Sequence, residues 1–194
     1  MKFPIANTLT LARIVMIPLV VICFYLPYSW GKSLAALLFI AAGLTDSLDG
    51  YLARKLNQTS ALGAFLDPVA DKLMVAIALI LLVSDEPLLL RPFAFDPHIL
   101  ITITATVIVG REIAISALRE WMAELGARAK IAVSSLGKLK TIFQMTGLSM
   151  MLYRDDLFSL PVFELGVGLL VAAAALTLWS MLAYLRAAWP ELSK

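Results

Sequence analysis

Long apolar runs dominate this chain, and several of them end in charged residues before they are long enough to cross a bilayer. Three runs, at residues 33–44, 73–83 and 99–110, have only about a dozen residues each and would reach roughly 18 Å as helices. Crossing the hydrocarbon core takes about 20 residues, so each helix must complete its passage with a charged segment. Such a segment cannot face lipid and has to line a polar cavity or leave the bilayer surface.

The composition favours an integral membrane protein. Of the 194 residues, 61% are hydrophobic and 15% are charged, whereas soluble domains are nearer half apolar and a quarter charged. We expect a single all-α domain over residues 1–194, with six transmembrane helices and a short interfacial segment at residues 2–12, where Asn7 and Thr8 are plausible N-caps. The first helix is expected to end at residue 27, and the other five are expected to cover residues 33–56, 61–83, 99–125, 132–153 and 161–188.

The charged helix ends are expected to meet on one side of the membrane. In an up-down arrangement, the C-terminal ends of the second and fourth helices lie on the same side as the N-terminal ends of the third and fifth. Nearly all lysines and arginines fall on that side, and only Lys32, Arg91 and Arg154 fall opposite. By the positive-inside rule that side is cytoplasmic. We therefore predict a polar cavity at the cytoplasmic face, with both termini on the same side.

Four aspartates lie close together in residues 46–71. Asp46 and Asp49 are three residues apart, and Asp67 and Asp71 are four apart. On two helices each pair shares one face, with Cβ atoms about 5–6 Å apart. Four facing carboxylates repel one another and need a counter-charge in a low-dielectric site. Oxygen ligands in this number suit Mg²⁺, Mn²⁺ or Ca²⁺ rather than zinc, so the stretch predicts a divalent-metal site.

Small residues accompany the acids. Gly50 and Ala53 share the face of the first aspartate pair, and Gly63 shares the face of the second. Small residues allow helices to approach closely or leave room for a flat ligand group. Arg54, directly after Ala53, can reach a phosphate.

Read as D-x-x-D-G-x-x-A-R, eight residues, then G-x-x-x-D-x-x-x-D, the stretch resembles the signature of the CDP-alcohol phosphotransferase family, with every position filled. The resemblance implies a pair of Mg²⁺ or Mn²⁺ ions. It implies metal ligation by Asp46, Asp49 and Asp67, with Asp71 partly a ligand and mainly the catalytic general base. It also implies a binding site for CDP-diacylglycerol at Asp46, Asp49, Gly50, Ala53, Arg54, Gly63 and Asp67.

A basic set of residues follows later in the chain. The segments G-R-E at 110–112, S-A-L-R-E-W-M-A-E-L-G at 116–126 and G-K-L-K-T at 137–141 resemble the branch of this family whose acceptor is glycerol 3-phosphate. Arginine and lysine together suit a phosphate monoester, although a patch that binds lipid headgroups or sets the topology would look the same. Glu112 is expected to be a structural partner of Arg111. The resemblance implies that the acceptor binds at Arg111, Arg119, Lys138, Lys140 and Thr141, with Arg13 as a further candidate that could equally be an interfacial cation.

The resemblance as a whole implies transfer of the phosphatidyl group from CDP-diacylglycerol to the primary hydroxyl of sn-glycerol 3-phosphate. It places the protein in the bacterial cytoplasmic (inner) membrane as a multi-pass homodimer, among membrane lipid and without a nucleic-acid partner. Alternatives are another acceptor (inositol phosphate, serine or phosphatidylglycerol), a divalent-cation channel or transporter, and a receptor or scaffold that binds anionic lipid.

Overall fold

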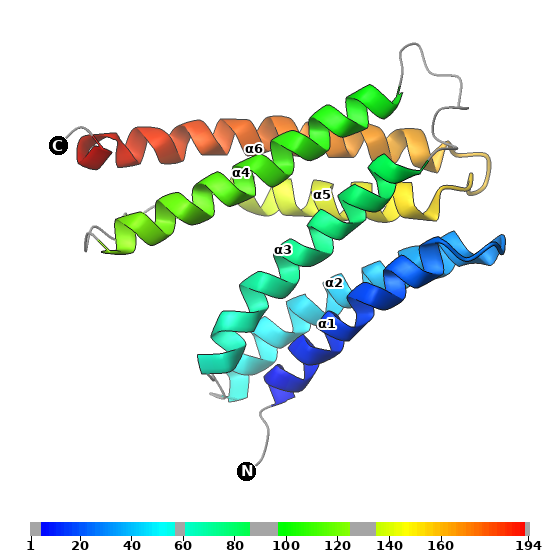
Figure 1. Cartoon of the computed structure of the whole chain (residues 1–194), viewed down its shortest axis with the longest axis horizontal. Coiled ribbons are helices and arrows are strands. Elements are labelled where there is room, and N and C mark those ends of the chain that lie inside the picture. The colour runs from blue at the N-terminus through cyan, green and yellow to red at the C-terminus, as the bar shows by residue number, and fades with distance from the viewer. Residues whose placement is uncertain (1–4, 57–60, 86–96, 125–134, 193–194) are drawn as a thin grey trace. The chain divides into compact units, whose positions relative to one another are not determined.

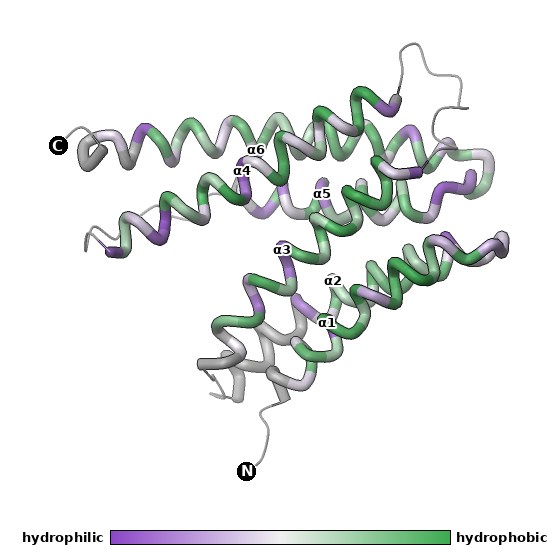
Figure 2. Tube along the Cα trace, in the orientation of Figure 1, coloured by the Kyte–Doolittle hydropathy of each residue, from purple (hydrophilic) through white to green (hydrophobic). Residues whose placement is uncertain are grey.

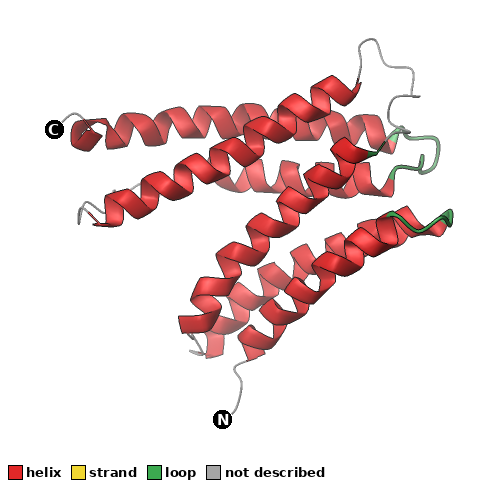
Figure 3. Cartoon of the chain, viewed as in Figure 1, coloured by secondary structure: helices red, strands yellow, loops and turns green. Residues whose placement is uncertain are grey.

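The computed structural model describes residues 5–56, 61–85, 97–124 and 135–192, and nearly all of them are helical (Figures 1 and 3). The helices are α1 (Ile5–Phe24), α2 (Trp30–Leu56), α3 (Ala61–Ser84), α4 (Pro97–Glu124), α5 (Ser135–Tyr153) and α6 (Val162–Leu192). The predicted all-α class and the six predicted helices are confirmed for these residues. Side chains are not described at residues 5–7, 47–56, 61–62, 64, 97, 135–136, 187–188 and 190–192.

The helices form two compact units. The first comprises Met1–Asp85 with Leu148–Gly166, and the second comprises Glu86–Gly147 with Val167–Lys194. Within the first unit the chain runs along α1, returns along α2 and turns again into α3 (Figure 1), and α1 packs against both of the others. The expectation of one domain over the whole chain stays a prediction.

The core of the first unit combines small and large side chains on α2. Ala35, Phe39 and Ala42 follow one another at steps of four and three residues, and each has an exposed fraction of 0%. These steps place them on one helix face. Small residues that alternate with a large one on a buried face allow close helix packing and still fill the space.

The turn from α1 into α2 depends on Gly31. A Cβ atom there would lie 2.8 Å from the carbonyl oxygen of Cys23 and 3.1 Å from that of Leu26. Both are backbone atoms, one in the last turn of α1 and one in the turn that follows it, so they cannot move aside as a flexible side chain would. Only glycine fits this close approach of the backbone.

The N-terminal part of α1 differs from the expectation. The chain is continuously helical from Ile5 to Phe24, so Asn7 and Thr8 lie inside the helix rather than at a cap, and the interfacial position of residues 2–12 stays a prediction. The physical reason lies one turn further on. Thr10 and Arg13 are buried and bond to other helices of the unit, and such tertiary contacts override a local capping preference.

A cluster of charged residues lies at the C-terminal end of α3. Asp85 is only 9% exposed and pairs with Lys32 at the start of α2, at an Oδ2–Nζ distance of 2.8 Å. It also pairs with Arg154, the residue that follows α5. The Lys32 ammonium lies 5.1 Å from the centroid of the Phe24 ring. The cluster therefore ties three segments of the first unit together.

Two of the described helices are long and apolar enough to cross a membrane by length and composition: His98–Glu124 and Val162–Arg186. A shorter apolar helix covers Thr8–Phe24. Hydrophilic residues interrupt α3 part-way along its length, as Figure 2 shows. The crossing of a membrane by all six helices stays a prediction.

Candidate active site

The first unit contains a buried arginine between two of the predicted acids. Arg13 on α1 has an exposed side-chain fraction of 0%, and its Nη1 atom lies 2.9 Å from Oδ1 of Asp46 on α2. The same nitrogen donates to Oδ1 of Asp71 on α3 at 2.8 Å. The two carboxylates are partly exposed, at 43% and 47%. One cation of α1 thus holds acidic side chains of two other helices.

A third acid reaches α1 one turn earlier. Thr10, only 1% exposed, donates a hydrogen bond of 2.6 Å from its hydroxyl to Oδ1 of Asp67. Because Thr10 and Arg13 are three residues apart, they share one face of α1. The structure therefore brings Asp46, Asp67 and Asp71 together around that face. The role of Thr10 was not predicted from the sequence, although two polar residues three apart in an apolar helix were a usable signal.

The remaining residues predicted for this site are less fully described. Gly63 is buried in α3, one turn before Asp67, which agrees with close helix packing. The others lie in α2, but their side chains fall outside the described set: Asp49, Gly50, Ala53 and Arg54. Their roles stay predictions.

The donors at this cluster suit a hard divalent cation. Asp46, Asp67 and Asp71 offer carboxylate oxygens only, which is the chemistry that Mg²⁺ and Mn²⁺ prefer. Among the described side chains, no three acidic, histidine or cysteine residues form a group arranged to hold an ion, and the positive charge at two of the carboxylates comes from Arg13. The donor set fits the predicted metal, and the metal site itself stays a prediction.

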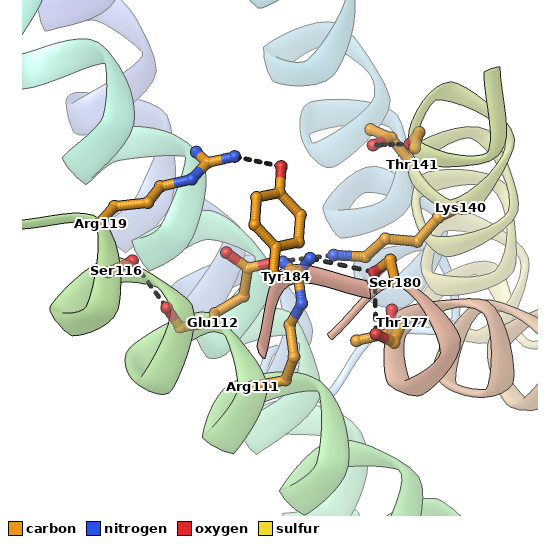
Figure 4. Close-up of polar contacts among 10 residues, drawn as sticks. Arg111, Glu112, Ser116, Arg119, Lys140, Thr141, Thr177, Ser180 and Tyr184 are labelled. Atoms are coloured by element: carbon orange, nitrogen blue, oxygen red, sulfur yellow. Dashed lines mark hydrogen bonds and ion pairs between the residues drawn. The ribbon is translucent and has the colours of Figure 1, made fainter. Parts of the chain in front are cut away.

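A second polar cluster, in the other unit, centres on Glu112 of α4 (Figure 4). Its Oε1 atom accepts a hydrogen bond of 2.8 Å from Nζ of Lys140 on α5 and one of 3.0 Å from Nη1 of Arg111. Lys140 is 8% exposed, so its charge is neutralised inside the unit. The predicted pairing of Glu112 with Arg111 is confirmed.

Two residues of α6 complete this cluster. Arg111 donates from Nη2 to the hydroxyl oxygen of Ser180 at 3.1 Å, and Arg119 donates from Nη2 to the hydroxyl oxygen of Tyr184 at 2.6 Å (Figure 4). The guanidinium carbons of Arg111 and Arg119 lie 5.8 Å and 5.1 Å from the centroid of the Tyr184 ring. Ser180 and Tyr184 were not predicted from the sequence, although their spacing of four residues in an apolar helix places them on one face.

Two further predicted residues lie on the outside of α5. Lys138 is exposed, and Thr141 is exposed with its hydroxyl donating to the carbonyl oxygen of Gly137 at 3.1 Å. The structure therefore joins Arg111 and Lys140 through Glu112, and Arg111 and Arg119 through Tyr184. Arg13 lies with the acids of the first unit, and its predicted contact with a phosphate stays a prediction.

Comparison with known proteins identifies the class. Residues 3–179 match the CDP-alcohol phosphatidyltransferase family, and the chain belongs to that family. Curated relatives from Salmonella choleraesuis, Salmonella typhimurium and Escherichia coli (strain K12) are each 47% identical to it over 192 residues, or 99% of this chain and 98% of the relative. Each of these relatives is named CDP-diacylglycerol–glycerol-3-phosphate 3-phosphatidyltransferase. The family predicted from the aspartate signature is confirmed, and so is the predicted class of enzyme, a transferase of phospholipid biosynthesis.

Proposed function

We propose that this protein transfers the phosphatidyl group of CDP-diacylglycerol to the primary hydroxyl of sn-glycerol 3-phosphate, giving phosphatidylglycerophosphate and CMP. The observation that carries the proposal is the identity of 47% to enzymes of that name over nearly their whole length. The two polar clusters support it, because one suits the nucleotide donor and the other suits a phosphorylated acceptor.

At the acidic cluster, Asp46, Asp49 and Asp67 would hold a pair of Mg²⁺ or Mn²⁺ ions, with Asp71 partly a ligand. When bound, such ions neutralise a pyrophosphate and stabilise the charge that gathers on it during displacement. Arg13 keeps two of these carboxylates in place through its ion pairs. The side chain of Asp71, about half exposed, is free to face an incoming substrate on its solvent side.

Asp71 is proposed as the general base. It takes the proton from the primary hydroxyl of the acceptor, and the hydroxyl oxygen then forms a bond to the phosphorus that bears diacylglycerol. The bond from that phosphorus to the oxygen of CMP breaks, and CMP leaves with its electron pair. Gly50, Ala53 and Gly63 would leave room for the nucleotide, and Arg54 would pair with a phosphate.

At the basic cluster, the charges suit a phosphate monoester. Arg111, Arg119 and Lys140 carry three positive charges and Glu112 carries one negative charge. The remaining two positive charges would balance a phosphate dianion. Guanidinium and ammonium groups both donate well to phosphate oxygens. The exposed Lys138 and Thr141 on α5 are proposed to extend this site.

The same proposal places the protein in a bacterial cytoplasmic membrane. All six helices would cross it, with a polar cavity and the acids at the cytoplasmic face, and the protein would work as a homodimer. Support comes from the two long apolar helices and from the excess of lysine and arginine on the predicted inner side. Labelling of cysteines introduced at the two ends of α3 in intact cells tests the orientation.

The decisive experiment measures CMP release by purified protein from CDP-diacylglycerol. Glycerol 3-phosphate, inositol phosphate, serine and phosphatidylglycerol are offered in parallel, and only glycerol 3-phosphate is expected to support turnover. Asp71→Asn should abolish turnover while the protein still folds, whereas Asp155→Asn, an exposed loop aspartate, should behave as wild type. Chelation of divalent ions should also stop the reaction.

Two results would contradict the proposal. Turnover with one of the other acceptors in place of glycerol 3-phosphate would reject the assigned reaction. Normal rates in Asp71→Asn would remove the general base while leaving the reaction itself standing.

A further inference from the structure

Two polar residues of α6 hold the two arginines of α4. Ser180 accepts from Arg111, and Tyr184 accepts from Arg119 (Figure 4). The hydroxyl of Ser180 also donates to the carbonyl oxygen of Thr177 at 2.9 Å. Because its only proton is used there, the oxygen of Ser180 is left as an acceptor for Arg111. The orientation of this hydroxyl is therefore set within α6 itself.

Without such a device, the two arginines would be far apart. They are eight residues apart on α4, which separates their backbones by about 12 Å along the helix axis. A single phosphate group is much smaller than that. Both side chains can donate to one phosphate only when their guanidinium groups are bent towards a common point.

The ring of Tyr184 supplies that common point. The guanidinium carbons of Arg111 and Arg119 lie 5.8 Å and 5.1 Å from its centroid, and the ring attracts both cations through its electron-rich face. The phenolic oxygen adds the hydrogen bond of 2.6 Å to Arg119. Glu112 reduces the repulsion between the cations by pairing with Arg111 and Lys140.

We propose that Tyr184 is a positioning residue of the acceptor site: its ring and hydroxyl bring Arg111 and Arg119 together so that both donate to the phosphate of the acceptor. The inference rests on the proposed function, since it concerns the same acceptor. Tyr184 acts through the arginines and touches neither the reacting phosphorus nor the attacking hydroxyl.

The test is steady-state kinetics of two variants of the full chain in detergent micelles containing CDP-diacylglycerol. Tyr184→Phe keeps the ring and removes the hydrogen bond, and the apparent KM for glycerol 3-phosphate should rise about fivefold. Tyr184→Leu removes the ring as well, and the rise should reach about thirtyfold. In both variants kcat and the KM for CDP-diacylglycerol should stay within about twofold of wild type.

Tyr25→Phe is the matched control. It also removes a hydrogen-bonded tyrosine hydroxyl, here one paired with the hydroxyl of Ser84 at 2.8 Å in the first unit, and it should leave the KM for glycerol 3-phosphate unchanged. Thermal unfolding of every variant shows whether the fold is intact.

Wild-type KM values for glycerol 3-phosphate in both Tyr184 variants would overturn the inference. A rise of equal size in the KM values for both substrates, or a fall in kcat alone, would do the same, because it would indicate a general packing role. If wild-type protein itself fails to release CMP with glycerol 3-phosphate, the proposed function falls together with the inference. If wild-type protein turns over and both variants keep its KM for glycerol 3-phosphate, only the proposed role of Tyr184 is rejected.

Discussion

Replacement of Arg13 by methionine tests whether a positive charge on α1 holds the acidic cluster together. Methionine has a similar length and suits a buried site, so the change removes the charge and both ion pairs but little volume. Oδ1 of Asp46 and Oδ1 of Asp71 lie 2.9 Å and 2.8 Å from the same nitrogen. The two oxygens are therefore at most about 6 Å apart.

The expected loss of stability follows from that distance. Two unit charges about 6 Å apart repel by about 3 kcal/mol at an effective dielectric constant of about 20. The carboxylates are 43% and 47% exposed, so solvent screening reduces the net effect to about 2 kcal/mol. In a protein of this size each kcal/mol corresponds to roughly 2–4 °C in Tm, and Arg13→Met should lower Tm by about 4–8 °C.

The assay is thermal unfolding in detergent, first with EDTA and then with Mg²⁺ or Mn²⁺. A divalent ion replaces the missing counter-charge, so it should raise the Tm of Arg13→Met by more than it raises that of wild type. Arg13→Lys keeps the charge and should unfold close to wild type in EDTA. Arg186→Met, at an exposed arginine of α6, is the matched control and should leave Tm unchanged.

Two outcomes would refute this reasoning. In the first, Arg13→Met unfolds at the wild-type temperature in EDTA, which would mean that the acids need no counter-charge from α1. In the second, Arg13→Lys loses as much stability as Arg13→Met, which would assign the role of Arg13 to its shape rather than its charge.

Two further predictions are measured by thermal unfolding in detergent. Gly31→Ala should lower the free energy of unfolding by about 1–3 kcal/mol, because the new methyl would overlap the backbone at the end of α1. Gly168→Ala is its control, since a Cβ there meets nothing within 4 Å, and equal stability of the two variants would contradict the argument. Asp85→Asn should lower the free energy of unfolding by about 2 kcal/mol, because Lys32 and Arg154 lose the carboxylate that they share. An effect no larger than that of Asp155→Asn would show that this cluster contributes little to stability.

Local features of the sequence determined the class of fold and most helix boundaries. Apolar runs, prolines and polar turns act over a few residues, so the expected helices 61–83 and 99–125 lie within two residues of α3 and α4. The fixed spacing of the aspartates was also sufficient for the family, because the signature depends on residue types at set offsets along the chain.

Tertiary structure alone decided which side chains meet. Arg13 and Asp71 are 58 residues apart in the chain, Arg119 and Tyr184 are 65 apart, and Arg111 and Ser180 are 69 apart. Thr10, Ser180 and Tyr184 carry no charge, so in the sequence they look like ordinary polar residues of an apolar helix. Their partners are determined by the rotation of each helix about its own axis relative to its neighbour. That rotation is set by the packing of whole helix faces, and no short window of sequence contains it.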